Sequence, residues 1–189
     1  MKFSELVRKR KSVRAFKKKS VDWRAIMDAL DDANQGPMAG NVNTLRTIII
    51  EDTDTIKTLA KYTHQSWIAQ APAIIVVCSN DSRLVDMYGE QGKIYARQQV
   101  GAAIQTILLS LTEKEIATTW VGYFTEGMIK TVLKIPGHMV IDAIIPVGYE
   151  KFEKVKAERK KQDIESTIYW DEWDKRSRPT MFKDAPLRG

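Results

Sequence analysis

The feature that most constrains the fold is an uninterrupted apolar run at residues 73–79, rich in isoleucine and valine and preceded by Pro72. Such a run, without polar alternation, is typical of a buried strand in the middle of a sheet. It is far too short to cross a bilayer as a helix. It also contains the single cysteine, Cys78. A chain with one cysteine cannot form an intrachain disulfide, which fits a protein of a reducing compartment. We therefore expect a cytoplasmic protein, not a membrane protein, with this run as its central strand.

The rest of the chain predicts helices and strands interleaved around this strand. Apolar residues at helical spacing and capping residues predict helices at residues 3–11, 23–34, 55–62, 92–114 and 126–133. Further apolar runs predict strands at residues 45–51, 118–124 and 140–148. Beyond residue 149 the composition shifts to Lys and Arg, and then to aromatic and charged residues. We expect one α+β domain over residues 1–189, whose tail packs either on itself or on a partner subunit.

The start of the chain is strongly basic. Residues 8–19 hold eight Lys or Arg and no acid, in a chain whose net charge is +6. If the first helix ends near residue 11, Arg10, Ser12 and Arg14 can converge on one anion, because guanidinium forks and a hydroxyl suit phosphate oxygens. A solvated basic arm is the alternative. A nucleic-acid arm has less support, since neither interleaved aromatic residues nor a reading helix accompanies it.

Two further segments have the chemistry to approach a planar ligand. Residues 36–44 hold two glycines, a proline and two asparagines, so that backbone N–H groups and amides can reach the edge of a heterocycle. Residues 119–122 end a predicted strand. Taken by itself, the loop is better explained as a plain helix-to-strand connector, and residues 119–122 as a strand end. The sequence has no metal-ligand spacing, Walker loop or paired carboxylates, so that an enzyme of this kind would take its chemistry from a bound cofactor.

Taken in order, these segments resemble the flavin-dependent nitroreductase family. The resemblance covers nearly the whole chain and rests on these motifs: Arg10-Lys11-Ser12-Val13-Arg14-Ala15-Phe16, Pro37-Met38-Ala39-Gly40-Asn41-Val42-Asn43, Ala71-Pro72, Gly101-Ala102-Ala103-Ile104-Gln105, Trp120-Val121-Gly122, Leu133-Lys134-Ile135-Pro136, Pro146-Val147-Gly148-Tyr149 and the basic run at residues 160–164. It implies a mostly antiparallel sheet of four to five strands flanked by helices. It also implies a homodimer in which residues 150–189 embrace the partner subunit.

The resemblance further implies FMN as the cofactor and NADH or NADPH as the electron donor, with a nitroaromatic, quinone or similar planar acceptor reduced in a ping-pong cycle. The flavin would carry the chemistry, so no catalytic side chain and no metal are expected. The phosphate would be held by Arg10, Lys11, Ser12 and Arg14, with Lys160 or Lys161 closing on it. The ribityl chain or ring edge would meet Pro37, Met38, Ala39, Asn41 and Asn43 from one subunit. The other side of the ring would be flanked by Thr119, Trp120, Val121 and Gly122.

Two departures from the family pattern concern the surroundings of the ring. Met38 and Ala39 stand where Ser-Ser or Ser-Ala is frequent, and Asn43-Thr44 stands where Gln-Pro is usual. Two further departures are Gln99, at a helix position that is often Asp, and Lys161, at one that is often Arg. Specialised flavin relatives, which dehalogenate a substrate reductively or break down the flavin, remain an alternative. Such relatives usually carry an added lid, and the sequence has no insertion long enough to form one. A basic nucleic-acid-binding module is the third hypothesis, and it predicts affinity that falls steeply with salt.

Overall fold

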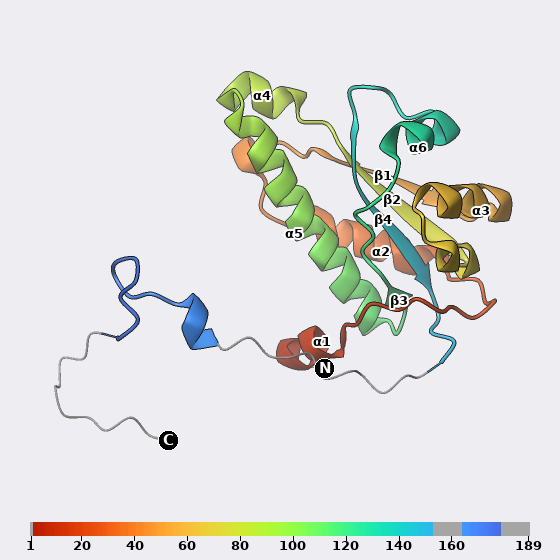
Figure 1. Ribbon diagram of the computed structural model, residues 1–189, viewed down its shortest axis with the longest axis horizontal. Helices are drawn as coiled ribbons and strands as arrows, with labels where there is room; N and C mark the ends of the chain where they lie inside the picture. Colours follow the sequence, from red (N-terminus) through yellow and green to blue (C-terminus); the bar gives the residue numbers. More distant parts are fainter. Residues whose placement is uncertain (1, 153–163, 179–189) are drawn as a thin grey trace. The chain divides into compact units, whose positions relative to one another are not determined.

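The computed structural model describes residues 2–152 and 164–178. At its centre lies β2 (Ala73–Ser79), the predicted central strand, in which every residue is buried. It pairs antiparallel with β1 (Leu45–Ile50) on one side and β4 (Val140–Gly148) on the other, and β4 pairs antiparallel with the short β3 (Ala117–Thr118). The strand order β1-β2-β4-β3 confirms the predicted antiparallel sheet of four strands (Figure 1).

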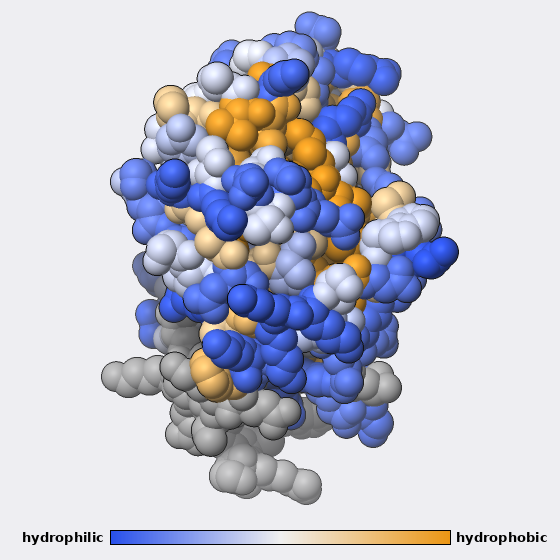
Figure 2. All heavy atoms as spheres, turned by 90° about the vertical axis from the view of Figure 1, so that its right-hand side faces the viewer, coloured by the Kyte–Doolittle hydropathy of each residue, from blue (hydrophilic) through white to orange (hydrophobic). Residues whose placement is uncertain are grey.

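Helices cover both faces of the sheet because consecutive side chains of β2 point to opposite sides. Ile75 and Val77 enter a core with α2 (Trp23–Asn34) and the long α5 (Gln91–Glu113). Ile74, Val76 and Cys78 enter a second core with α3 (Thr53–Tyr62), the 3-10 helix η2 (Ser66–Gln70) and α6 (Glu126–Leu133). Figure 1 shows the two helical layers on either side of the strands. Figure 2, which views the side of α3 and α6, shows a band of apolar residues between charged ones on that face.

Two predicted elements are wrong in detail, and one helix was not predicted. The first helix, α1 (Phe3–Lys9), ends before residue 11, because Arg10 already has the extended torsions φ −56° and ψ 127°. The strand predicted at residues 118–124 is a strand only at Ala117–Thr118, followed by one isolated bridge from Val121 to Ile144. Two of its three aromatic residues, Trp120 and Tyr123, are 42% and 73% exposed, whereas the third, Phe124, packs against the second core. The helix α4 (Ser82–Tyr88) was not predicted, since Leu84 is its only buried residue.

Residues 164–178 belong to a second unit, which begins at Lys154 and is described here by itself. Its described part starts with the 3-10 helix η3 (Ile164–Thr167) and continues into a tight turn in which the Trp170 N–H donates to the Lys175 carbonyl at 2.7 Å. The rings of Tyr169 and Trp173 lie 4.5 Å apart. No helix in the described ranges is long and apolar enough to span a membrane.

Candidate functional site

The basic segment, residues 8–19, begins in the last turn of α1, and its continuation after the helix is fixed by backbone hydrogen bonds to the sheet. The Val13 N–H donates to the Thr118 carbonyl at 3.1 Å, and the Thr119 hydroxyl donates to the Val13 carbonyl. Further along, the Lys17 N–H donates to the Tyr149 carbonyl at 2.7 Å. The segment therefore has a defined conformation between the end of β4 and β3, which a solvated arm would not need.

Along this segment, buried side chains that anchor it alternate with side chains that are exposed. Val13 and Phe16 are buried at 5% and 2% exposure, and the Phe16 ring stacks on Trp67 with the ring centroids 6.5 Å apart. Ser12 and Arg14, which flank Val13, are exposed. The anchors thus hold a hydroxyl and a guanidinium at the surface, two positions apart on an extended backbone, which places both on the same side.

Several other cations of the segment have partners in the chain. Lys11 Nζ lies 2.6 Å from a carboxylate oxygen of Glu150, and Lys9 Nζ lies 3.3 Å from Glu115. The charge of Lys11, a predicted phosphate ligand, is therefore already partly compensated. The predicted Lys160 and Lys161 lie outside the described residues.

The predicted ring-edge loop, residues 36–44, is shaped by two consecutive residues with left-handed backbone torsions. Gly40 has φ 55° and Asn41 has φ 56°, within the 3-10 helix η1 (Ala39–Asn41). A Cβ atom at Gly40 would lie 2.7 Å from Cε of Met87, so α4 packs directly on the tip of this loop. The exposed Asn41 makes no side-chain hydrogen bond to the described part of the chain, whereas Pro37, Met38 and Ala39 form the approach to the tip.

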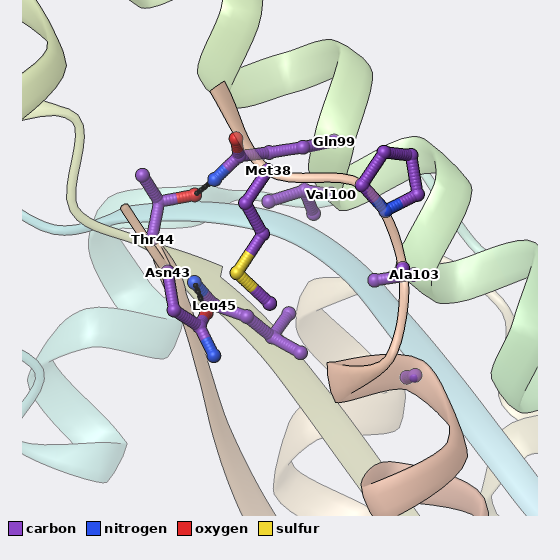
Figure 3. Close-up of a pocket in the computed structure, with 10 residues that line it drawn as sticks. Met38, Asn43, Thr44, Leu45, Gln99, Val100 and Ala103 are labelled. Atoms are coloured by element: carbon purple, nitrogen blue, oxygen red, sulfur yellow. Dashed lines mark hydrogen bonds between the residues drawn. The ribbon is translucent and has the colours of Figure 1, made fainter. Parts of the chain in front are cut away.

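A small open hollow lies between this loop, the end of α2 and α5. Gln99 reaches into it from α5, and the Met38 side chain extends across it towards Leu45 (Figure 3). Asn43 lies at its rim, but its carboxamide is used within the chain. Its Oδ1 accepts from the Leu45 N–H at 2.9 Å, and its Nδ2 donates to Asn34 at 3.0 Å. Asn43 therefore holds the exit of the loop.

The third predicted segment also alternates. Thr119 and Val121 are buried, at 4% and 3% exposure, and Val121 exchanges two backbone hydrogen bonds with Ile144. Trp120 is 42% exposed, and a Cβ at Gly122 would meet open space. Trp120 and Gly122 are thus the members of this segment that can face a ligand. Because Thr119 bonds to Val13, the segment adjoins the basic segment in the same chain.

The basic segment and the ring-edge loop lie at different places along α5. The loop meets α5 at Gln99, whereas the salt bridge of Lys9 is to Glu115, just beyond the last residue of the helix, Glu113. Fourteen residues of α-helix span about 20 Å. The structure of one chain therefore does not bring these two predicted parts of the site together (Figure 1).

The ionisable groups of the interior do not form a metal site. Arg97 on α5 donates to Asp81 at 3.0 Å, to Ser79 at 2.6 Å and to Asp142, so the two carboxylates at this end of the sheet share one guanidinium. No group of three acidic, histidine or cysteine side chains in the described ranges could hold a metal ion. Burial raises the pKa of the Cys78 thiol to about 11, which keeps it neutral and unreactive.

Known proteins resemble this chain over most of its length. The family model described as the nitroreductase family matches residues 7–69 and 60–149. The chain belongs to the nitroreductase family. A putative NADH dehydrogenase/NAD(P)H nitroreductase of Archaeoglobus fulgidus is 26% identical over 178 residues, 89% of this chain and 97% of its own length. An iodotyrosine deiodinase of Thermotoga neapolitana is 25% identical over 173 residues, 82% of this chain and 92% of its own length.

Solved structures share the nitroreductase fold. A nitroreductase family protein from Clostridium novyi NT superposes with a TM-score of 0.73 at 25% identity, covering 93% of this chain and 96% of its own. Another from Clostridium difficile 630 gives a TM-score of 0.76 at 23% identity, covering 91% and 99%. The fold and the family predicted from the motifs are therefore confirmed.

Sequence reasoning missed three contributors to this nitroreductase site. Glu150 pairs with Lys11, the α4 residue Met87 packs on Gly40, and Gln99 bonds to the ring-edge loop. The only signal in the sequence was the departure at Gln99 from the acidic residue that is frequent there. The other two contacts join residues far apart in the chain, which no local pattern reports.

Proposed function

We propose that this nitroreductase family member binds FMN and uses NADH or NADPH to reduce nitroaromatics, quinones or similar planar acceptors in a ping-pong cycle. The observation that carries the proposal is the basic segment. It is bonded to the sheet by its backbone, so that Ser12 and Arg14 stand on one exposed side, next to Arg10. A guanidinium and a hydroxyl held in this way match the oxygens of a phosphate monoester.

The other predicted residues fit the remaining parts of FMN. Trp120 and Gly122 adjoin the basic segment and suit one side of the ring, because one is a planar exposed side chain and the other leaves open space. The loop residues Met38 and Asn41 suit the ring edge, with Pro37 and Ala39 shaping their approach. When bound, the flavin would supply hydride and electron transfer, which no side chain can supply. The protein's own residues would bind it, orient it and limit access of water.

A homodimer follows from the same geometry. The basic segment and the ring-edge loop are about 20 Å apart along α5 of one chain, by the rise of an α-helix, so we infer that one flavin uses the segment of one subunit and the loop of its partner. Three exposed features of α5 and α1 support contact with a second copy of the chain. On α5, Ile94 is 49% exposed and a Cβ at Gly101 would meet nothing within 4 Å. On α1, no residue is buried and Phe3 is 72% exposed. The embrace of the partner by residues 150–189 stays a prediction.

The experiment that tests this function is the visible absorption spectrum of the purified protein before and after NADH or NADPH, together with FMN titration. We expect Arg14→Ala to weaken FMN binding at least about tenfold, because a charge-assisted hydrogen bond is worth about 1.5–3 kcal/mol. Lys18→Ala, which removes another exposed cation of the same segment, is the matched control. A protein without FMN affinity, or an equal loss in both variants, would contradict the proposal, and a monomer in sedimentation would contradict the shared site.

Reductive dehalogenation is the second candidate, since the deiodinase of Thermotoga neapolitana is among the relatives. Anaerobic turnover of the reduced protein against nitro, quinone and iodinated aromatic acceptors separates the two. Release of iodide at a rate above that of nitro or quinone reduction would favour the dehalogenase.

A further inference from the structure

One side chain of α5 holds the ring-edge loop at three points. Gln99 accepts with Oε1 from the Ala39 N–H at 3.0 Å, and donates with Nε2 to the Val42 carbonyl at 3.0 Å and to the Thr44 hydroxyl at 2.6 Å. Figure 3 shows its amide directed at Thr44 beside the hollow. These contacts span six residues of loop and include its left-handed tip between Ala39 and Val42.

We propose that Gln99 is a positioning residue for flavin binding, which holds residues 39–44 in the conformation that borders the ring. This role rests on the proposed function. The tip can take no other support of this kind from its own backbone, because the Asn41 and Val42 N–H groups already donate to Met38 and Ala39 within the turn. The amide thus links the tip to the most extensive helix of the fold, and Asn41 is presented outwards as a consequence.

A carboxamide is the group that these three partners require. The Ala39 N–H needs an acceptor and the Val42 carbonyl needs a donor, and only a group with both satisfies them at once. A carboxylate at this position would accept from Ala39 but would set a negative charge against the Val42 carbonyl. A protonated carboxyl group again carries one acceptor and one donor. In the Gln99→Glu variant, the hydrogen bonds that hold the loop (the Gln99 clamp) should therefore depend on pH.

The surroundings of Gln99 allow a pH dependence of the Gln99→Glu variant to be assigned to the introduced carboxyl group. The hollow is lined by residues without ionisable side chains: Ala33, Gly36, Pro37, Met38, Asn43, Thr44, Leu45, Val100 and Ala103. Two charged groups close to Gln99 or to the lining residue Leu45 in the sequence are already engaged. Arg97 on α5 bonds to Asp81 and Asp142, and Arg46 on β1 donates to the Leu45 carbonyl at 2.6 Å. The protonated fraction of a carboxyl group introduced at Gln99 grows as the pH falls from 8 to 5, and with it the number of molecules that can donate to the Val42 carbonyl.

The first measurement is the FMN dissociation constant of Gln99→Glu divided by that of the wild type, at pH 5 and at pH 8. The ratio removes the titration of the FMN phosphate, which affects both proteins. We expect the ratio to be smaller at pH 5 than at pH 8, where it should reach about ten or more, since a buried carbonyl then loses its donor. Gln91→Glu, an exposed position at the start of the same helix, is the matched control and should keep a ratio near one at both pH values.

The second measurement needs no flavin. Hydrogen exchange of the Ala39 amide should be slow in the wild type and at least about tenfold faster in Gln99→Leu, which has no acceptor. A pH-independent ratio for Gln99→Glu, the same pH dependence in Gln91→Glu, or fast exchange at Ala39 in the wild type would overturn the proposal. Failure of the wild type to bind FMN would refute the function and the positioning role with it, and slow exchange at Ala39 would identify that case, because the clamp would still be present.

Discussion

The packing around Gly148 gives the sharpest test of how the fold supports the basic segment. Gly148 ends β4, and a Cβ there would lie 2.7 Å from Cδ of Pro72 and 2.9 Å from Cδ1 of Phe16. Atoms cannot remain this close, and neither neighbour moves easily, since Pro72 is a rigid ring and Phe16 is 2% exposed. Overpacking of this kind costs about 1–3 kcal/mol. We therefore expect Gly148→Ala to lower the free energy of unfolding by about 1–3 kcal/mol.

Urea unfolding measures this change, and two further variants make the result specific. Gly127→Ala on α6 meets open space and should stabilise by about 0.5–1 kcal/mol, because alanine favours a helix over glycine. In Gly148→Ala combined with Phe16→Leu, the two losses should be less than additive, because the smaller side chain relieves the contact. Gly148→Ala should also weaken FMN binding, since Phe16 anchors the segment that carries Arg14. A Gly148→Ala protein as stable as the wild type, or strictly additive losses, would refute this reasoning.

Two predictions concern the interior groups beside the sheet. Arg97→Met should lower the free energy of urea unfolding by about 3 kcal/mol, the lower end for a broken buried pair because the Arg97 side chain is 36% exposed. The exposed Arg83→Met is the control and should lower it little. Equal losses would contradict a pairing role for Arg97 towards the Asp142 carboxylate, which is only 9% exposed. Cys78, whose pKa burial raises to about 11, should resist iodoacetamide at pH 8 in the folded protein. Since the folded pKa lies above that of an unfolded thiol, the thiol's contribution to stability is present below about pH 9 and is lost as the pH rises to 11; Cys78→Val should therefore lose less stability than the wild type over this interval.

The elements that could be predicted from sequence are those whose pattern is local and complete. The bounds of β2, β4 and α6 agree with the sequence prediction, because each is a continuous apolar or amphipathic run closed by turn residues. The strand predicted at 118–124 was wrong because a run of aromatic and β-branched residues has the same pattern whether it is buried or exposed. Trp120 and Tyr123 are at the surface, which only the tertiary structure reveals.

The candidate site was predictable as a set of segments, but its organisation was not. The sequence identified the basic segment, the ring-edge loop and residues 119–122 by residue type. It could not report that Glu150 pairs with Lys11, or that the exposed Asn43 uses its carboxamide for hydrogen bonds to Asn34 and Leu45. These assignments depend on which side chain is the nearest polar neighbour in space, and the partners come from distant parts of the chain.

The motifs that carried the resemblance divide into two kinds once the structure is known. Ser12, Arg14 and Asn41 present polar groups at the surface, where a ligand can reach them. Pro72 and Gly148 have no polar side-chain atom to offer a ligand, yet Gly148 lies between Pro72 and Phe16, and Phe16 belongs to the segment that carries Ser12 and Arg14. A motif of this second kind acts through packing, because it fixes where an extended backbone lies and hence where the alternate side chains point. A bulky residue at position 148 would therefore disturb phosphate binding without removing a single hydrogen-bonding group from the site.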